Sequence, residues 1–61
     1  MKLYISKGNS IKKISKKSLT EQLGKEKVDK MIKEGKETFM EDPSVQIEYI
    51  TSIGNLIIEF M

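Results

Sequence analysis

The C-terminal stretch Ser44–Met61, which reads SVQIEYITSIGNLIIEFM, decides the fold of this 61-residue chain. It contains two runs rich in β-branched and aromatic residues, 44–53 and 56–61, which are the residue types that favour strands. Gly54 and Asn55 separate the runs, and two turn-forming residues between two such runs are typical of a β-hairpin. We therefore predict two antiparallel strands joined by a turn at Gly54 and Asn55.

This turn implies a register that can be checked against the hydrophobic pattern. It pairs Ile53 with Leu56, Thr51 with Ile58, and Tyr49 with Phe60. Successive side chains of a strand point to opposite faces of the sheet, so the register also sorts the side chains into two faces. The predicted core face carries Val45, Ile47, Tyr49, Thr51, Ile53, Leu56, Ile58 and Phe60. The opposite face is mixed and carries Gln46, Glu48, Ile50, Ser52, Ile57, Glu59 and Met61.

A long helix is predicted directly before the hairpin. Pro43 disfavours helical geometry at the residue before it, so the helix should end near Asp42. Between Lys25 and about Met40, apolar residues recur at helical spacing and form one stripe. The stripe consists of Val28, Met31, Ile32, Phe39 and Met40. Gly35 lies in this stripe, where it either permits close approach to the sheet or is a weak point of the helix.

A shorter helix is predicted over residues 15–23. One start places Ser15 at the N-cap, with Ile14 and Leu19 at the spacing of a hydrophobic staple. The other start is Ser18, with Glu21 three residues later as in a capping box. In both cases the helix turns Leu19 and Leu23 inward and stops at Gly24, because glycine readily adopts the left-handed conformation that ends helices.

The N-terminal residues Lys2–Ser6 alternate polar and apolar, which predicts a short strand, and turn residues follow at 7–10. The predicted order is therefore strand, helix, helix, strand, strand. We expect an α+β fold in which a three-stranded antiparallel sheet carries both helices on one face. With 61 residues, the chain should form a single domain, 1–61.

The composition argues against several classes of function. The chain has no Cys and no His, so it lacks the usual nucleophile, proton shuttle and metal ligand. We therefore expect no catalytic residue, no metal and no cofactor, and we expect that the protein is not an enzyme. No apolar run approaches the ~18 residues of a membrane span, which favours a cytoplasmic protein that does not associate with membranes.

The mixed face of the hairpin is the first candidate site. Its apolar residues are flanked by acids, and Tyr4 of the first strand should lie beside them. Contiguous apolar surface with a polar rim often marks a protein interface, and open sheet edges can accept a partner. The candidate partner-binding residues are Tyr4, Glu48, Ile50, Ile57, Glu59 and Met61, and the partner is another protein or a second copy of the chain.

The charge distribution suggests an alternative site. The first 20 residues hold six lysines and no acid, whereas residues 41–61 hold four acids and no base. A helix N-terminus surrounded by lysines could bind an anion or nucleic-acid phosphates. The candidate residues are Lys12, Lys13, Lys16 and Lys17. The chain has no Arg, the residue most used for base readout, and Lys-rich, Arg-free composition can also arise from an AT-rich genome.

We therefore expect a small non-enzymatic interaction module, an adaptor or inhibitor of the kind encoded by phages and mobile elements. The alternative is nucleic-acid or anion binding through the lysines. The helix-turn-helix pattern matches weakly, because the helix after Gly24 carries as many acids as bases at Glu26–Lys30. The ribbon-helix-helix pattern also matches weakly, because its strand is usually basic and its first helix is longer than Ser15–Leu23 allows.

Overall fold

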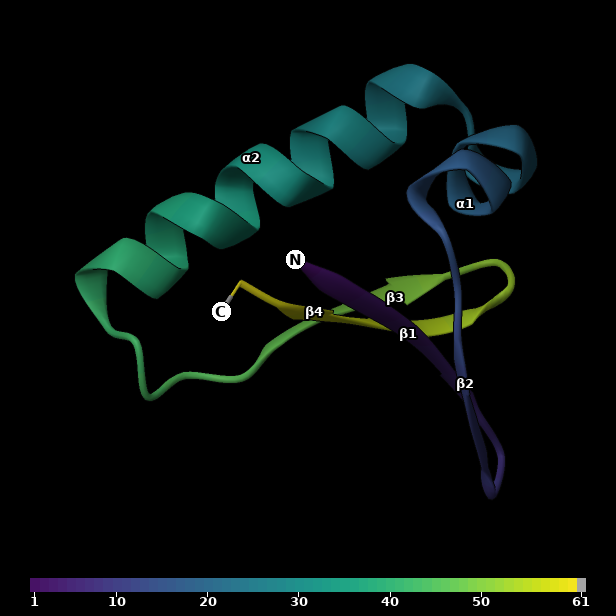
Figure 1. The fold of residues 1–61 in the computed structure, drawn as a ribbon, viewed down its shortest axis with the longest axis horizontal. Helices are drawn as coiled ribbons and strands as arrows, with labels where there is room; N and C mark the ends of the chain where they lie inside the picture. Colours follow the sequence, from purple (N-terminus) through teal and green to yellow (C-terminus); the bar gives the residue numbers. More distant parts are fainter. Residues whose placement is uncertain (61) are drawn as a thin grey trace.

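A computed structural model describes residues 1–60 and shows a two-layer α+β fold (Figure 1). Two helices lie on one face of an antiparallel sheet whose strand order is β2-β1-β4-β3. The elements are β1 (Lys2–Lys7), β2 (Ser10–Lys13), α1 (Lys16–Leu23), α2 (Lys25–Glu41), β3 (Ile47–Thr51) and β4 (Gly54–Glu59). The first and last strands are neighbours, because β1 pairs with β4 at the centre of the sheet, with Lys2 opposite Glu59.

The predicted fold class and the packing of both helices on one face are confirmed, but the predicted number of strands is wrong. The sheet has four strands, because residues 10–13 form β2 and pair with β1, with Lys7 opposite Ser10 and Tyr4 opposite Lys13. Gly8, at φ +61°, and Asn9 form the two-residue turn between them. The element order is therefore β-β-α-α-β-β. Every residue of β2 is exposed, so this strand lacks the buried alternation by which strands are recognised in a sequence.

Both helices begin and end where local hydrogen bonding dictates. The Ser15 hydroxyl accepts a hydrogen bond from the Ser18 amide at 3.1 Å, so Ser15 and not Ser18 is the N-cap of α1. Gly24, at φ +94°, ends α1 by donating its amide to the Thr20 carbonyl at 2.8 Å, and α2 begins at the next residue. The Asp42 amide donates to the Thr38 carbonyl and closes α2 before Pro43, as predicted.

The core lies between the helices and the sheet. Its buried members are Leu3, Leu19, Val28, Met31, Ile47, Leu56 and Ile58. Gly35 is buried at the closest approach of α2 to the sheet, where a β-carbon would lie 2.8 Å from Cγ2 of Ile47. This contact explains the glycine in the apolar stripe. Met40, predicted to lie on the same stripe, is 73% exposed near the end of the helix and lies outside the core.

The C-terminal hairpin forms, but its turn and register differ from those predicted. The turn is Ser52-Ile53, with Thr51 opposite Gly54 and Ile47 opposite Ile58. The Thr51 hydroxyl closes this turn by donating to the Gly54 carbonyl and accepting from the Ile53 amide. Tyr49 pairs with Leu56 rather than Phe60, a shift of four residues. Because four is an even number, each side chain of β3 and β4 keeps its predicted face.

Gly54 is thus the first residue of β4 and not a turn residue. It has φ +124°, and a β-carbon there would lie 2.9 Å from the Ser6 carbonyl oxygen and 2.9 Å from Cγ2 of Ile5. Close approach to β1, together with positive φ, accounts for glycine at this position.

Candidate protein-binding face

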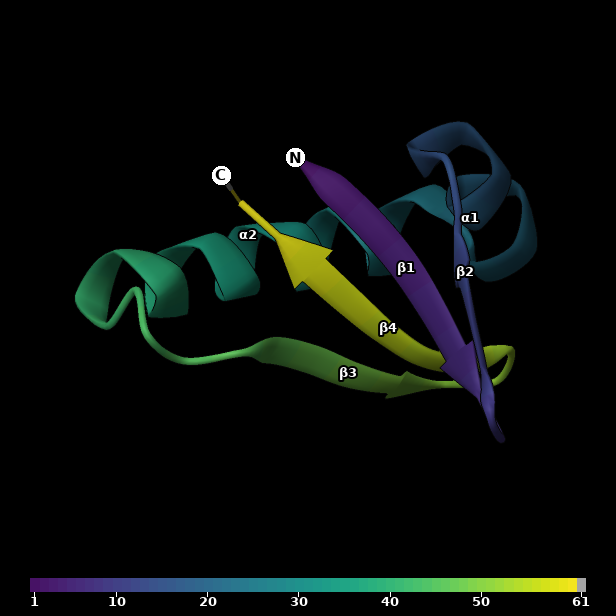
Figure 2. The same cartoon turned by 60° about the horizontal axis from the view of Figure 1, so that its bottom comes forward.

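The face of the sheet that points away from both helices is called the outer face here. Figure 2 looks onto it, with α1 and α2 behind the strands. Side-chain alternation along each strand determines its members, and the strand pairing places them in lines across the sheet. The strands contribute Lys2, Tyr4 and Ser6 from β1, Ile11 and Lys13 from β2, Glu48 and Ile50 from β3, and Asn55, Ile57 and Glu59 from β4.

The structure brings together the partner-binding residues predicted on the first and last strands. Tyr4 lies directly opposite Ile57 across the β1–β4 ladder, and Ile57 lies opposite Glu48 across the β3–β4 ladder. Ile50 is 88% exposed and Glu59 is also exposed. Met61 lies outside the described residues. The other five predicted residues therefore share one surface.

One apolar residue of this surface was not predicted. Ile11, on the edge strand β2, is 65% exposed and lies opposite Ser6. The prediction for Val45 is wrong: it was assigned to the core face, but β3 begins only at Ile47, and Val45 is 42% exposed in the segment before it. Ile11 was missed because its strand was missed. The available signal was the Gly8-Asn9 pair, which forms the two-residue turn between β1 and β2.

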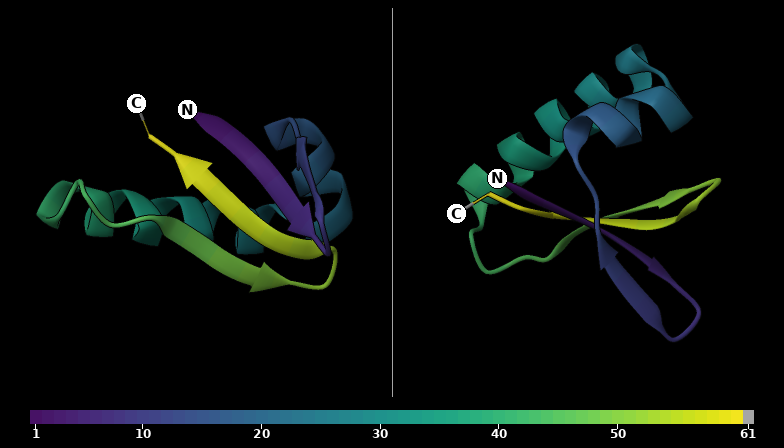
Figure 3. Two further views of the ribbon diagram at one scale, coloured as in Figure 1. Left: turned by 90° about the horizontal axis from the view of Figure 1, so that it is seen from below. Right: turned by 45° about the vertical axis from the view of Figure 1, so that its right-hand side comes forward.

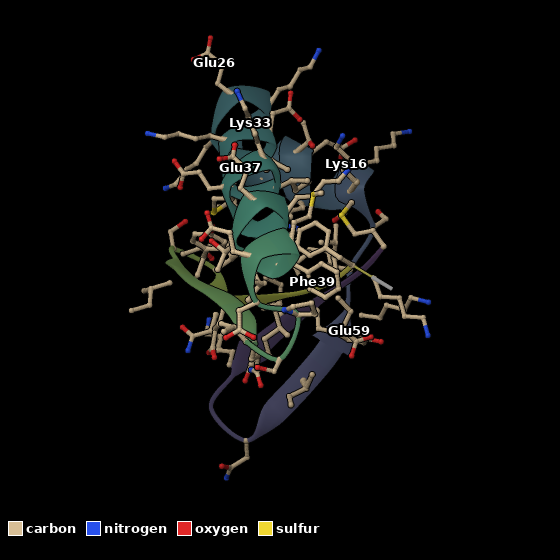
Figure 4. All side chains as sticks on the ribbon, turned by 90° about the vertical axis from the view of Figure 1, so that its left-hand side faces the viewer. Lys16, Glu26, Lys33, Glu37, Phe39 and Glu59 are labelled. Atoms are coloured by element: carbon tan, nitrogen blue, oxygen red, sulfur yellow. The ribbon has the colours of Figure 1, made fainter. Side chains whose placement is uncertain are left out.

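An apolar groove of about 580 Å³ crosses the outer face. Tyr4, Ile11 and Ile57 line it from the sheet, while Pro43 and Val45 line it from the α2–β3 connection. At its far end it reaches Phe39 and Phe60, whose ring centroids are 5.6 Å apart. Figure 4 shows Phe39 pointing from the end of α2 toward the sheet, with Glu59 beyond it.

The connection that forms one wall of the groove is fixed by Asp42. Its Oδ1 accepts hydrogen bonds from the Ser44 amide at 3.1 Å and from the Ser44 hydroxyl at 2.6 Å. These two bonds favour the carboxylate and lower the pKa of Asp42 below its usual value. The Val45 amide also donates to the Asp42 carbonyl, so Pro43 and Val45 are held in a defined turn.

A polar corner borders the groove. Glu48 accepts hydrogen bonds from the Asn55 side-chain amide at 2.9 Å and from the Gln46 side-chain amide at 3.3 Å. The acids of the outer face, Glu48 and Glu59, lie on β3 and β4, whereas its lysines, Lys2 and Lys13, lie on β1 and β2. The two halves of the face therefore carry opposite charge.

The lysines of the alternative site are divided among different surfaces. Lys13 lies on the outer face, whereas Lys12 lies on the opposite face of β2, across from Ile5. Lys16 forms an exposed ion pair with Asp29 of α2, with Nζ 3.6 Å from Oδ1. Lys17 is exposed on the first turn of α1. Lys7, Lys12 and Lys13 border a second hollow of about 450 Å³ beside the β1–β2 hairpin, which projects beyond the helices in Figure 3.

On the helix-facing side, burial and the nearby Glu34 carboxylate raise the pKa of Tyr49 above its usual value. Within residues 1–60, no group of three or more acids is close enough together to hold a metal ion. Neither helix is long and apolar enough to cross a membrane.

Comparison of the chain with protein-family models, with curated proteins and with solved structures gives no match.

Proposed function

We propose that this chain is a small non-enzymatic interaction module, an adaptor or inhibitor, that binds another protein through the outer face of its sheet. The observation that carries the proposal is the apolar groove on a sheet face that no helix covers. Ile11, which lines the groove, and Ile50, on the same face of the sheet, are both largely exposed. Burying an isoleucine side chain fully would stabilise by about 1.5–3 kcal/mol. Apolar surface of this kind, rimmed by charges, is typical of protein interfaces.

The groove is better suited to a protein than to a small substrate. It lies between a sheet face and a loop, and most of its lining residues are apolar, with Gln46 and Glu59 the lining residues that carry an amide or a carboxylate. Small-molecule sites instead enclose most of the ligand and direct a few polar groups at it. The absence of Cys from the sequence also fits a reducing compartment, and we propose the cytoplasm as the site of action.

Nucleic-acid binding through Lys12, Lys13, Lys16 and Lys17 is the second candidate. Its support is the hollow bordered by Lys7, Lys12 and Lys13. It has less support than the protein-binding proposal, because Lys16 is paired with Asp29 and Lys12 and Lys13 point to opposite sides of their strand.

Capture from an extract of the cell that expresses the protein distinguishes these candidates. Three immobilised variants are compared with wild type: Ile50→Lys with Ile57→Lys, Met40→Lys, and Lys7→Glu with Lys12→Glu, two lysines that border the second hollow and lie off the outer face. Met40 is the matched control because it is 73% exposed on α2, away from the sheet. Circular dichroism first establishes that each variant is folded.

The proposal expects the Ile50/Ile57 double variant to lose the captured protein while the other two variants retain it. Loss of capture in the Lys7/Lys12 variant alone, with nucleic acid in the wild-type eluate, would favour the second candidate. Unfolding of the Ile50/Ile57 variant would show that the outer face contributes to stability and would contradict its assignment as a free surface.

A further inference from the structure

The outer face carries positive charge on β1 and β2 and negative charge on β3 and β4, so its charge changes sign across the sheet, from one edge strand to the other. Lys13 and Lys2 lie on β2 and β1, and Glu48 and Glu59 lie on β3 and β4. None of these four side chains has an ion-pair partner among the described residues, because the one ion pair there joins Lys16 to Asp29. The face thus presents uncompensated positive charge on one half and negative charge on the other.

The strand register arranges the side chains of the outer face in lines that run across the sheet. Each line complements a second copy of itself that runs in the opposite direction. One line across the sheet reads Lys13, Tyr4, Ile57, Glu48. The next reads Ile11, Ser6, Asn55, Ile50, and on the two central strands Lys2 lies opposite Glu59. In each line the first residue complements the last, and the second complements the third: charge with opposite charge, apolar with apolar, and polar with polar.

We propose that the protein partner of the outer face is a second copy of this chain, packed face to face about a two-fold axis that runs parallel to the strands between β1 and β4. This inference rests on the proposed function and specifies its partner. Such an axis places β2 over β3 of the partner and β1 over β4 of the partner. Lys13 then meets Glu48, Lys2 meets Glu59, Tyr4 meets Ile57 and Ile11 meets Ile50 of the opposite copy.

The charges also select this orientation over the other symmetric one. A two-fold axis perpendicular to the strands, through the line of Lys13 and Glu48, would place Lys13 over Lys13 and Glu48 over Glu48. Like charges facing each other across an interface are unfavourable, so that arrangement is disfavoured. Both arrangements keep the strands of the two sheets aligned, as in sheet packing at about 30°, so the charges distinguish them.

The available area sets the strength of the dimer. Four strands about 4.8 Å apart and about five residues long, at about 3.3 Å per residue, form a face of roughly 19 by 17 Å. Two such faces cover roughly 650 Å² in total, which is below the size of stable specific interfaces and in the range of weak, transient ones. The dimer is therefore weak and forms at elevated protein concentration, and salt weakens it further because four ion pairs lie at its rim.

Charge reversal tests this arrangement. Lys13→Glu puts two acids at each contact with Glu48, and Glu48→Lys puts two lysines there, so each variant alone should dimerise about ten- to a hundredfold more weakly than wild type. An equimolar mixture of the two restores Glu with Lys at both contacts and should form a heterodimer about as tightly as the wild-type homodimer. Sedimentation equilibrium and native mass spectrometry measure both.

Lys17→Glu and Glu37→Lys are the matched controls, because both residues are exposed on the helices. Their variants should dimerise as wild type does. A wild type that remains monomeric at the highest soluble concentration would overturn the inference, as would a mixture of the Lys13 and Glu48 variants that fails to form heterodimers. In either case, the proposed function would still stand if the protein captures another protein through Ile50 and Ile57. If capture does not depend on these two residues, both the proposed function and the dimer are contradicted.

Discussion

Gly54 shows how one residue can be essential for a reason that its local sequence does not reveal. Next to Asn55 it resembles a turn residue, yet it begins β4 and lies against β1. Its positive φ and its contact with the Ser6 carbonyl both exclude a side chain. The neighbour across the sheet, and not the adjacent residue in the chain, determines the amino acid here.

Gly54→Ala is therefore expected to destabilise the protein by about 2–4 kcal/mol, the sum of the strain of a positive φ and of overpacking. Gly8→Ala is the matched control, because Gly8 also has positive φ, at +61°, but a β-carbon there would meet nothing within 4 Å. The control should lose only about 1–2 kcal/mol. Chemical denaturation measures both, and equal losses in the two variants would show that the contact with β1 has no effect.

Phe39 anchors the end of α2 over the sheet. It is partly buried, packs against the core and pairs with the Phe60 ring at a centroid distance of 5.6 Å. We expect Phe39→Ala to cost about 2–4 kcal/mol, somewhat less than for a fully buried phenylalanine. Met40→Ala, at the exposed neighbouring position, should change the stability by less than about 0.5 kcal/mol. Near-native melting of Phe39→Ala would contradict this role.

The position of α2 over the sheet depends on the absence of a side chain at Gly35. The helix would gain about 1 kcal/mol of intrinsic stability from Ala at this position. However, the added β-carbon would lie 2.8 Å from Cγ2 of buried Ile47, and 3.4 Å from two atoms of the Phe60 ring. A buried β-branched side chain cannot easily move aside, so the packing cost should exceed the gain.

We expect Gly35→Ala to lower the melting temperature by about 4–8 °C, which corresponds to a net loss of about 1 kcal/mol in a domain of this size. Ile47→Ala removes Cγ2, so in that background Gly35→Ala should cost less than it does in the wild type, which a double-mutant cycle measures. A melting temperature raised by Gly35→Ala would mean that α2 packs farther from β3 than described.

The helices and the faces of the strands were predictable because they follow from local periodicity. The stripe Val28–Met31 and the cap at Ser15 depend on residues close in sequence. The hairpin register was not predictable from the turn residues, since Thr51 stabilises a Ser52-Ile53 turn through its hydroxyl. The faces were nevertheless assigned correctly, because a shift of four residues preserves alternation.

Strand β2 escaped prediction because it contributes no buried side chain. Its pairing with β1 is maintained by backbone hydrogen bonds and a glycine turn, which leave little trace in the hydrophobic pattern. The omission affected the candidate site: it concealed Ile11 and Lys13 as members of the outer face and left the basic half of that face unrecognised.

In the whole molecule, the helices cover one side of the sheet and leave the other side open (Figure 3). The five predicted partner-binding residues that the structure describes lie on the open side, with Ile11 and Lys13 beside them. A two-layer domain of this size buries one sheet face with its own helices, and a second copy would bury the other. The self-complementary charge and apolar lines of the outer face are the reason to expect that copy.

Site-directed cross-linking tests this central claim most directly, because the chain has no native cysteine. Facing sheets lie about 10 Å apart, too far for a disulfide, so Ile11→Cys and Ile50→Cys chains are mixed and treated with a short bis-maleimide. We expect the mixture to yield cross-linked heterodimers. Neither variant alone should cross-link. In a homodimer of one variant, the cysteines of the two copies would lie about three strand spacings, roughly 14 Å, apart across the face, in addition to the separation of the sheets. Equal cross-linking in the single-variant samples, or none in the mixture at concentrations where the wild type associates, would contradict the face-to-face dimer.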